Sequence, residues 1–283
     1  MFFNLIRVRQ YYKNLLVFLV LIFAGLAFDL NAIGLTLLGF VSLCFISSTN
    51  YILNDIFDVE ADKKHPEKKN RAIASGKISV FWAGVLAAIF AVVSLVIAWF
   101  LSENFFYLII FLFMFTQIYS IYLKNQIFLD IIAIAINFVI RAVSGALILG
   151  VVASPWLISC AFFLSLFLAI GKRKGDLILL GKDAVNHKKV LKYYTKELLD
   201  KLLIIVIALL FASYSLYSFL GEYPMLITLP IVFYVILRYL YLIEENSMII
   251  RSPGKVYKDK GILIGIIIWI LLSIFLIYIY PLY

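Results

Sequence analysis

The sequence has few charged residues and almost no cysteine or histidine. Charged residues make up 14% of its 283 positions, against about 25% in soluble domains, whereas 65% are hydrophobic and the mean hydropathy is +1.06. This balance excludes a soluble globular protein. Both cysteines, Cys44 and Cys160, lie inside apolar runs, and His65 and His187 each stand alone in a polar loop. A disulfide framework and a Cys/His metal site are therefore excluded as well.

Apolar stretches long enough to cross a bilayer as helices recur along the whole chain. They are continuous in Leu, Ile, Val and Phe instead of alternating with polar residues, which excludes a transmembrane β-barrel. The sequence therefore predicts an all-α polytopic membrane protein with nine transmembrane helices. The predicted spans are 15–30, 34–53, 80–101, 104–122, 127–149, 155–171, 202–220, 224–242 and 262–281.

The basic residues lie on one side of this arrangement. With a cytoplasmic N-terminus, every Lys and Arg except Arg141 falls in or beside a cytoplasmic segment, and the opposite loops contain none. This bias predicts a multi-pass protein of the cytoplasmic membrane with its C-terminus outside. The chain has 25 Lys and Arg but 16 Asp and Glu. Orientation and phosphorylated ligands explain this excess better than nucleic acid, because the chain has no soluble basic domain.

An acidic group follows the second predicted span. Asn54, Asp55, Asp58 and Asp62 fall within about 100° of one another on a helix. Three carboxylates on one face repel one another unless a cation neutralises them, and oxygen ligands combined with substrate phosphates suit Mg²⁺. Asn50 extends this polar stripe into the span. We expect a magnesium-diphosphate site; the alternative is a solvated helix end.

A second group surrounds the fifth predicted span. Tyr119 and Lys124 precede it, and Asp130, Asn137 and Arg141 fall within about 60° on one face of it. An arginine within the membrane is a candidate functional residue, with a phosphate or Asp130 as its expected partner. A structural salt bridge is the alternative.

A third group, Lys172, Arg173 and Asp176, stands at the predicted end of the sixth span. Its two cations are suited to bind phosphate oxygens. Positive-inside anchoring explains the lysines further along, which precede the Tyr193–Tyr194 pair.

The motif Asn54-Asp55-x-x-Asp58-x-x-x-Asp62, followed by Arg71 and Ser75-Gly76, resembles the first aspartate-rich motif of the UbiA superfamily of membrane prenyltransferases. The resemblance implies nine helices around a central cavity that opens to the cytoplasmic side and the membrane, with residues 1–283 as one transferase domain.

Within this superfamily, enzymes that prenylate aromatic rings typically carry a second aspartate-rich motif after the sixth span. Here that place reads Lys172-Arg173-Lys174-Gly175-Asp176, which resembles the branch that transfers phosphoribose to a polyprenyl phosphate. Asp176 stands where that branch has glutamate, and Ala72 where it commonly has proline. Further matching segments are 9–14, 62–69, Tyr119-Ser120, Leu123-Lys124, Leu129-Asp130, Arg141 with Gly145, and 252–259.

The resemblance implies a Mg²⁺-dependent phosphoribosyltransferase, a type of glycosyltransferase. Phosphoribosyl pyrophosphate is the implied donor and a decaprenyl-like phosphate the acceptor, and a homo-oligomer is left open. Mg²⁺ is expected on Asp58 and Asp62, with Asn54 and Asp55 assisting. Asp130 is expected to orient Lys124 or a sugar hydroxyl. Residues expected to bind substrate or phosphate are Lys13, Asn14, Asn50, Arg71, Tyr119, Lys124, Arg141, Lys172, Arg173 and Asp176.

Two other functions stay open at this stage. A UbiA-type prenyltransferase, with an isoprenyl diphosphate donor and an aromatic or lipid acceptor, would use the same first motif. A transporter would explain Asp130 and Arg141 as parts of an ion path, but would leave the acidic group after the second span without a purpose.

Overall fold

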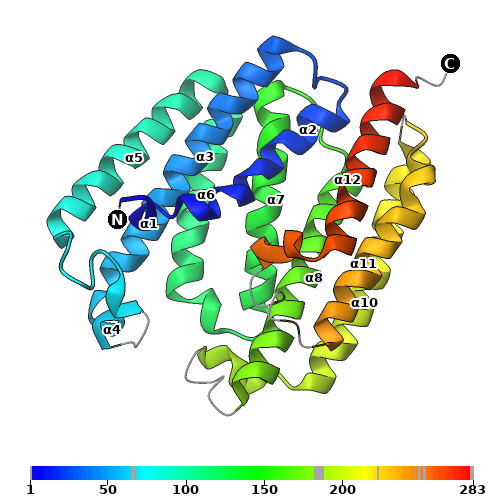
Figure 1. The fold of residues 1–283 in the computed structure, drawn as a ribbon. Helices are drawn as coiled ribbons and strands as arrows, with labels where there is room; N and C mark the ends of the chain where they lie inside the picture. The colour runs from blue at the N-terminus through cyan, green and yellow to red at the C-terminus, as the bar shows by residue number, and fades with distance from the viewer. Residues whose placement is uncertain are drawn as a thin grey trace. The chain divides into compact units, whose positions relative to one another are not determined.

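The computed structural model describes residues 2–64, 68–181, 188–221, 223–245, 247, 250 and 253–280. His65, His187 and parts of the matching segments 62–69 and 252–259 lie outside this set. The described residues form helices and no strands (Figure 1), so the predicted all-α class is confirmed. Eight of the helices are long and apolar enough to span a membrane.

The helices follow the predicted spans except at the start of the chain and at the end of α8. The main helices are α3 (Leu30–Phe57), α5 (Val80–Leu101), α6 (Glu103–Ile121), α7 (Leu129–Leu149), α8 (Pro155–Leu180), α10 (Lys196–Leu220), α11 (Leu229–Glu244) and α12 (Lys260–Ile274). The shorter helices are α1 (Phe2–Leu5), η1 (Val8–Val17), α2 (Phe18–Phe23), α4 (Val59–Lys64), η2 (Lys68–Asn70), η3 (Leu123–Asn125), η5 (Lys189–Tyr193), η6 (Met225–Thr228), η7 (Pro253–Lys258) and η8 (Phe275–Ile279).

The chain divides into two compact units. The first comprises Met1–Ile121 with Ile140–Val152, and the second comprises Tyr122–Val139 with Ala153–Tyr283. In the first unit, α3 packs closely on α5 because Ser42 and Ser94 each donate a hydrogen bond to the other's backbone carbonyl, at 2.9 and 2.8 Å. The second unit has an apolar core in which Phe167 of α8, Leu203 of α10 and Tyr239 of α11 are buried.

The prediction of a first span as one α-helix over 15–30 is wrong. The structure instead places the 3₁₀ helix η1 and the short α2 there, and nine long helices are not confirmed. The segment nevertheless runs antiparallel to α3, since Arg7 contacts Asp55, Tyr11 contacts Ser48 and Phe18 contacts Phe40 (Figure 1).

The 3₁₀ segment is as long as the stretch of α3 that lies beside it. From Arg7 to Phe18 a 3₁₀ helix rises about 22 Å, and from Asp55 back to Phe40 an α-helix also rises about 22 Å. With three residues per turn, residues 11, 14 and 17 share one face. That face meets α3 at Tyr11 and Asn14, and it meets α7 where Val17 packs on Gly145.

Helix α8, which corresponds to the sixth predicted span, is longer than predicted. The sequence places its end near residue 171, but α8 continues to Leu180. Lys172, Arg173 and Asp176 therefore lie within the helix and not at its end. The helix continues through this basic stretch because Arg173 and Lys174 are both buried and both paired with carboxylates.

The contact between Val17 and Gly145 generates a prediction on stability. A Cβ atom at Gly145 would lie 2.2 Å from the backbone oxygen of Val17, whereas one at Gly84 of α5 would meet nothing within 4 Å. We expect Gly145→Ala to destabilise the protein by roughly 1–3 kcal/mol through overpacking. Gly84→Ala, as matched control, should be neutral or slightly stabilising. Thermal unfolding in detergent measures both, and equal unfolding midpoints would contradict the close contact.

Candidate active site

The acidic group lies where α3 ends and α4 begins. Asp55 is in the last turn of α3, Asp58 is its C-cap residue, and Asp62 is in α4. The break at Asp58 interrupts the continuous helical face that the spacing predicts. A hydrogen bond of 2.8 Å from the backbone nitrogen of Asp62 to the carbonyl of Asp58 keeps the two segments together. Asp55 and Asp62 are 5% and 2% exposed, so both carboxylates need partners.

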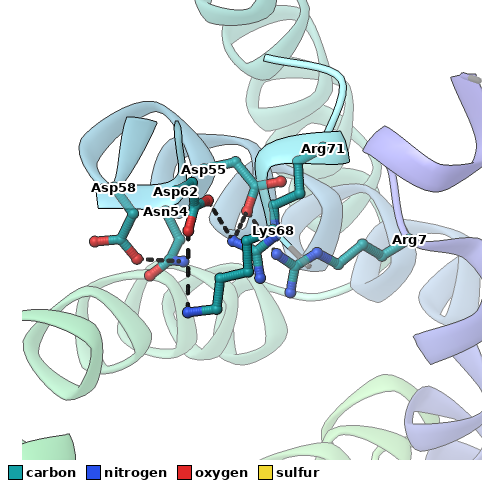
Figure 2. A network of polar contacts seen from close by, with 7 residues as sticks. All are labelled: Arg7, Asn54, Asp55, Asp58, Asp62, Lys68 and Arg71. Atoms are coloured by element: carbon teal, nitrogen blue, oxygen red, sulfur yellow. Dashed lines mark hydrogen bonds and ion pairs between the residues drawn. The ribbon is translucent and has the colours of Figure 1, made fainter. Parts of the chain in front are cut away.

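Arginine supplies these partners (Figure 2). Nη1 of Arg71 lies 3.0 Å from Asp55 and 2.7 Å from Asp62, so one guanidinium joins two buried carboxylates. Nη2 of Arg7 lies 2.5 Å from the same oxygen of Asp55. Lys68 is 3.9 Å from the other oxygen of Asp62.

Asn54 and Asp58 form a separate pair within the group. The Asn54 amide donates to the Asp58 carboxylate at 3.2 Å (Figure 2). In the part of the chain that the structure describes, no three acidic, histidine or cysteine side chains are close enough together to hold a metal by themselves. A metal here would therefore complete its coordination with other oxygens, such as those of water or of a substrate phosphate.

A second polar group surrounds Arg141 in the first unit. Arg141 is 8% exposed, and its Nε donates to the side-chain oxygen of Asn14 at 2.9 Å. Asn14 is 1% exposed and also donates to the sulfur of Cys44. The η1 segment therefore brings the predicted residues Asn14 and Arg141 together, although 127 positions separate them in the sequence.

Lys13 lies beside this group and is partly buried. Burial, together with the nearby charges of Arg141 and Arg7, lowers the pKa of Lys13 to about 8. No carboxylate forms an ion pair with Lys13 within the described ranges. Cations that depress one another's ionisation in this way are suited to an anionic ligand.

Asn50 is also buried, and it pairs with a residue that the sequence did not single out. The side chain of Gln117 in α6 donates to the Asn50 oxygen at 2.5 Å. Tyr119 lies two residues further along α6 and is partly exposed.

The third group belongs to the second unit and centres on Asp130. This residue is fully buried, and it accepts hydrogen bonds from Nε of Arg173 at 2.7 Å and from the Tyr194 hydroxyl at 2.6 Å. No ion pair joins Asp130 to Lys124 of η3 among the described residues, and both Asp130 oxygens accept hydrogen bonds from Arg173 and Tyr194. That Asp130 orients Lys124 or a sugar hydroxyl stays a prediction. Lys174 pairs with Asp200 and Glu244, at 2.5 and 2.6 Å.

Sequence reasoning missed several residues of these groups. Arg7, Lys68, Gln117, Tyr194 and Lys188 all contact or influence predicted site residues. Among these residues, only Arg7 has an unusual backbone conformation. Its φ of 52° is in the left-handed region that non-glycine residues rarely adopt.

Long apolar helices with buried ion pairs near their ends define a polytopic integral-membrane protein that is suited to anionic ligands. The model of the UbiA prenyltransferase family matches residues 15–248. The chain belongs to this family and is a membrane transferase, as its sequence motif predicts.

Individual relatives agree with this assignment. The decaprenyl-phosphate phosphoribosyltransferase of Mycolicibacterium smegmatis is 34% identical over 219 residues, which cover 76% of this chain and 69% of that protein. The protein of the same name from Mycobacterium tuberculosis is 30% identical over 76% of this chain and 72% of its own length. The solved structure of a UbiA homolog from Archaeoglobus fulgidus, bound to GPP and Mg²⁺, has a TM-score of 0.74 at 21% identity and covers 95% of this chain and 99% of its own. This likeness confirms the fold.

The Arg71 bridge generates a prediction on stability. Arg71→Met would leave Asp62 with Lys68 at 3.9 Å and would remove one of the two arginines at Asp55. We expect a destabilisation of about 2 kcal/mol, less than for a fully buried pair because Arg71 is 27% exposed. Lys63→Met, which breaks the exposed pair with Glu60, should change stability by less than about 0.5 kcal/mol.

Thermal unfolding in detergent without added metal compares the two variants. If Arg71→Met unfolded at the same temperature as Lys63→Met, Arg71 would contribute no more than an exposed ion pair. The structural role given to its bridge would then be wrong.

Proposed function

We propose that the protein transfers 5-phosphoribose from phosphoribosyl pyrophosphate to a decaprenyl-like polyprenyl phosphate and releases pyrophosphate. The product would be a lipid-linked phosphoribose for cell-envelope glycan synthesis. In this proposal residues 1–283 act as one transferase domain in the cytoplasmic membrane, with the active site facing the cytoplasm. The names of the relatives at 30–34% identity support the reaction.

The observation that carries the choice of branch is the buried basic stretch of α8. Arg173 and Lys174 are 1% and 0% exposed, and each is neutralised by carboxylates from other segments of the second unit. Within the stretch 172–176, Asp176 is the one acid, where enzymes that prenylate aromatic rings typically carry paired carboxylates. A basic stretch is suited to phosphate oxygens, which both proposed substrates carry.

Magnesium fits the donor chemistry of the acidic group. Asp58 and Asp62 carry carboxylates next to the Asn54 amide, and Mg²⁺ typically binds through one or two carboxylates together with substrate phosphates. We propose Asp58 and Asp62 as its ligands, with Asn54 and Asp55 assisting. When bound, Mg²⁺ would stabilise the negative charge of the departing pyrophosphate.

The chain's own residues then bind and orient the substrates. Arg71 joins the two buried carboxylates, and its planar guanidinium is also suited to a diphosphate. Lys13, Lys124, Arg141, Lys172 and Arg173 would bind the remaining phosphate charges, including the ribose 5-phosphate. Asn14 would hold Arg141, and Asn50, Tyr119 and Asp176 would contact the sugar or its phosphate.

The proposed reaction needs no general base. The acceptor is a phosphate monoester with a second pKa of about 6, so it is already an anionic nucleophile near neutral pH. Its oxygen attacks the anomeric carbon of the ribose, and the bond from that carbon to the pyrophosphate breaks. This agrees with the position of Asp130, whose two oxygens hold Arg173 and Tyr194 and which therefore positions them instead of accepting a proton.

The assay for this reaction uses detergent-purified protein, Mg²⁺, labelled phosphoribosyl pyrophosphate and a polyprenyl phosphate. We expect label to enter the lipid phase, and Asp58→Asn to reduce the rate at least 100-fold because the metal loses a carboxylate ligand. A parallel assay supplies labelled isoprenyl diphosphate and an aromatic or lipid acceptor. Prenyl transfer without phosphoribose transfer would reject the proposed branch while leaving the family unchanged.

The depressed pKa of Lys13 predicts a pH effect on substrate binding. Because this pKa is about 8, Lys13 is charged below pH 8 and loses its charge as the pH rises through that value. We expect the KM for one phosphorylated substrate to rise about tenfold between pH 7 and 9. Lys13→Arg should abolish the rise, since arginine stays protonated throughout this range. A KM that rises equally in the wild type and in Lys13→Arg would exclude Lys13 as the cause.

A further inference from the structure

Several charged side chains of the second unit surround Asp130. Lys172 and Arg173 come from α8, and Lys188 precedes η5. The acidic side chains that act on Lys188 are Asp130 of α7 and Asp176 of α8. Among the described residues, these three cations therefore lie close to the same two carboxylates.

Arg173 is held in one orientation but is not saturated with hydrogen bonds. Its Nε donates to Asp130, yet its terminal nitrogen Nη2 is buried and has no hydrogen-bond partner among the described residues. A buried donor without a partner is destabilising because it has lost its hydrogen bonds to water. Arg173 is 1% exposed, and its hydrogen bond to Asp130 fixes the orientation of the guanidinium. A ligand oxygen that reaches Nη2 would therefore accept a hydrogen bond from a donor that is already oriented.

Lys188 belongs to a segment that is anchored in the unit and not to a free surface. Val190 and Leu191 of η5 are 0% and 1% exposed. Tyr194, directly after η5, donates to Asp130 and accepts a hydrogen bond from the backbone nitrogen of Phe128 at 3.0 Å. Asp130 thus fixes both Arg173 and the segment that carries Lys188.

These surroundings lower the pKa of Lys188. Burial, followed by the charge of Arg173 and then that of Lys172, lowers the pKa of Lys188 to about 7, while Asp130 and Asp176 oppose this. Positive-inside anchoring, which the sequence predicts for this lysine, does not explain why Lys188 is partly buried beside two other cations. An anion bound beside Lys188 would offset the repulsion from Arg173 and Lys172.

We propose that Lys188 and Nη2 of Arg173 form a binding site for a phosphate monoester, with Asp130 and Tyr194 as positioning residues. Nη2 and the Lys188 ammonium would donate to its oxygens, and charge-assisted hydrogen bonds of this kind are among the stronger ones. The ligand chemistry fits two sources, the head group of a polyprenyl phosphate and the 5-phosphate of the sugar donor. The choice between these sources rests on the proposed function, whereas the site itself does not.

Chemical modification tests the site without requiring the transfer reaction. The full-length protein in detergent is treated with acetic anhydride across pH 5–10, and mass spectrometry measures acetylation of Lys188 and of its exposed neighbour Lys189. We expect Lys188 to become reactive with a midpoint near pH 7. Saturating inorganic phosphate should move this midpoint up by at least one pH unit and leave Lys189 unchanged.

Two further probes identify the source of the phosphate. Protection of Lys188 by a short polyprenyl phosphate but not by ribose 5-phosphate assigns the site to the acceptor, and the reverse assigns it to the donor. The proposal is overturned if none of the three phosphates protects Lys188, or if Lys188 and Lys189 react in parallel at every pH.

Variants separate binding from positioning. Lys188→Met should raise the KM for the protecting substrate about 10- to 100-fold, with most of the effect restored by Lys188→Arg, while Lys189→Met changes nothing. Tyr194→Phe should raise the phosphate concentration that half-protects Lys188 about fivefold without changing acetylation of Lys189. A purely structural role of Tyr194 would alter both lysines.

The two proposals fail in different ways. If the protein transfers no phosphoribose but phosphate protects Lys188, the anion site stands and the proposed function is wrong. If phosphoribose transfer is observed but Lys188 is not protected, only the site is wrong.

Discussion

Neutralisation of buried charge is the interaction on which the arrangement of this protein depends. In a low-dielectric interior an unpaired charge is strongly destabilising, so each buried ion must find a partner within its own unit. Asp55 and Asp62 share Arg71, Asp130 holds Arg173, and Lys174 joins Asp200 and Glu244. The pairs of Asp130 with Arg173 and of Lys174 with Glu244 link segments that are 43 and 70 positions apart. The same groups that hold the helix ends together are therefore those suited to bind phosphate.

Hydropathy was sufficient to predict most of the fold. The range 80–101 matches α5 at both ends, and 127–149 matches α7 within two residues, because apolar runs of this length can only be helices in a membrane. The end of α8 could not be predicted in the same way. A basic stretch ends an apolar pattern, and only the tertiary partners Asp130, Asp200 and Glu244 explain why the helix continues.

The candidate site was predictable where its residues are neighbours in the sequence. The spacing of Asn54, Asp55, Asp58 and Asp62 locates the acidic group, but it contains no information on which cations neutralise it. Arg7 and Arg71 reach Asp55 across 48 and 16 positions. Tyr194 reaches Asp130 across 64 positions. Such long-range partners depend on the packing of separate segments, which one sequence does not specify.

The 3₁₀ form of η1 makes the beginning of the chain sensitive to its exact length. With three residues per turn, removal of one residue between Arg7 and Val17 would rotate the preceding side chains by about 120° and shorten the segment by about 2 Å. Arg7 would then turn away from Asp55, or Asn14 away from Arg141. Removal of three residues would keep the rotation but would withdraw Arg7 by about 6 Å along α3. The number of residues in η1 therefore fixes the distance and the rotation between Arg7 at Asp55 and Asn14 at Arg141. That number is itself a structural requirement.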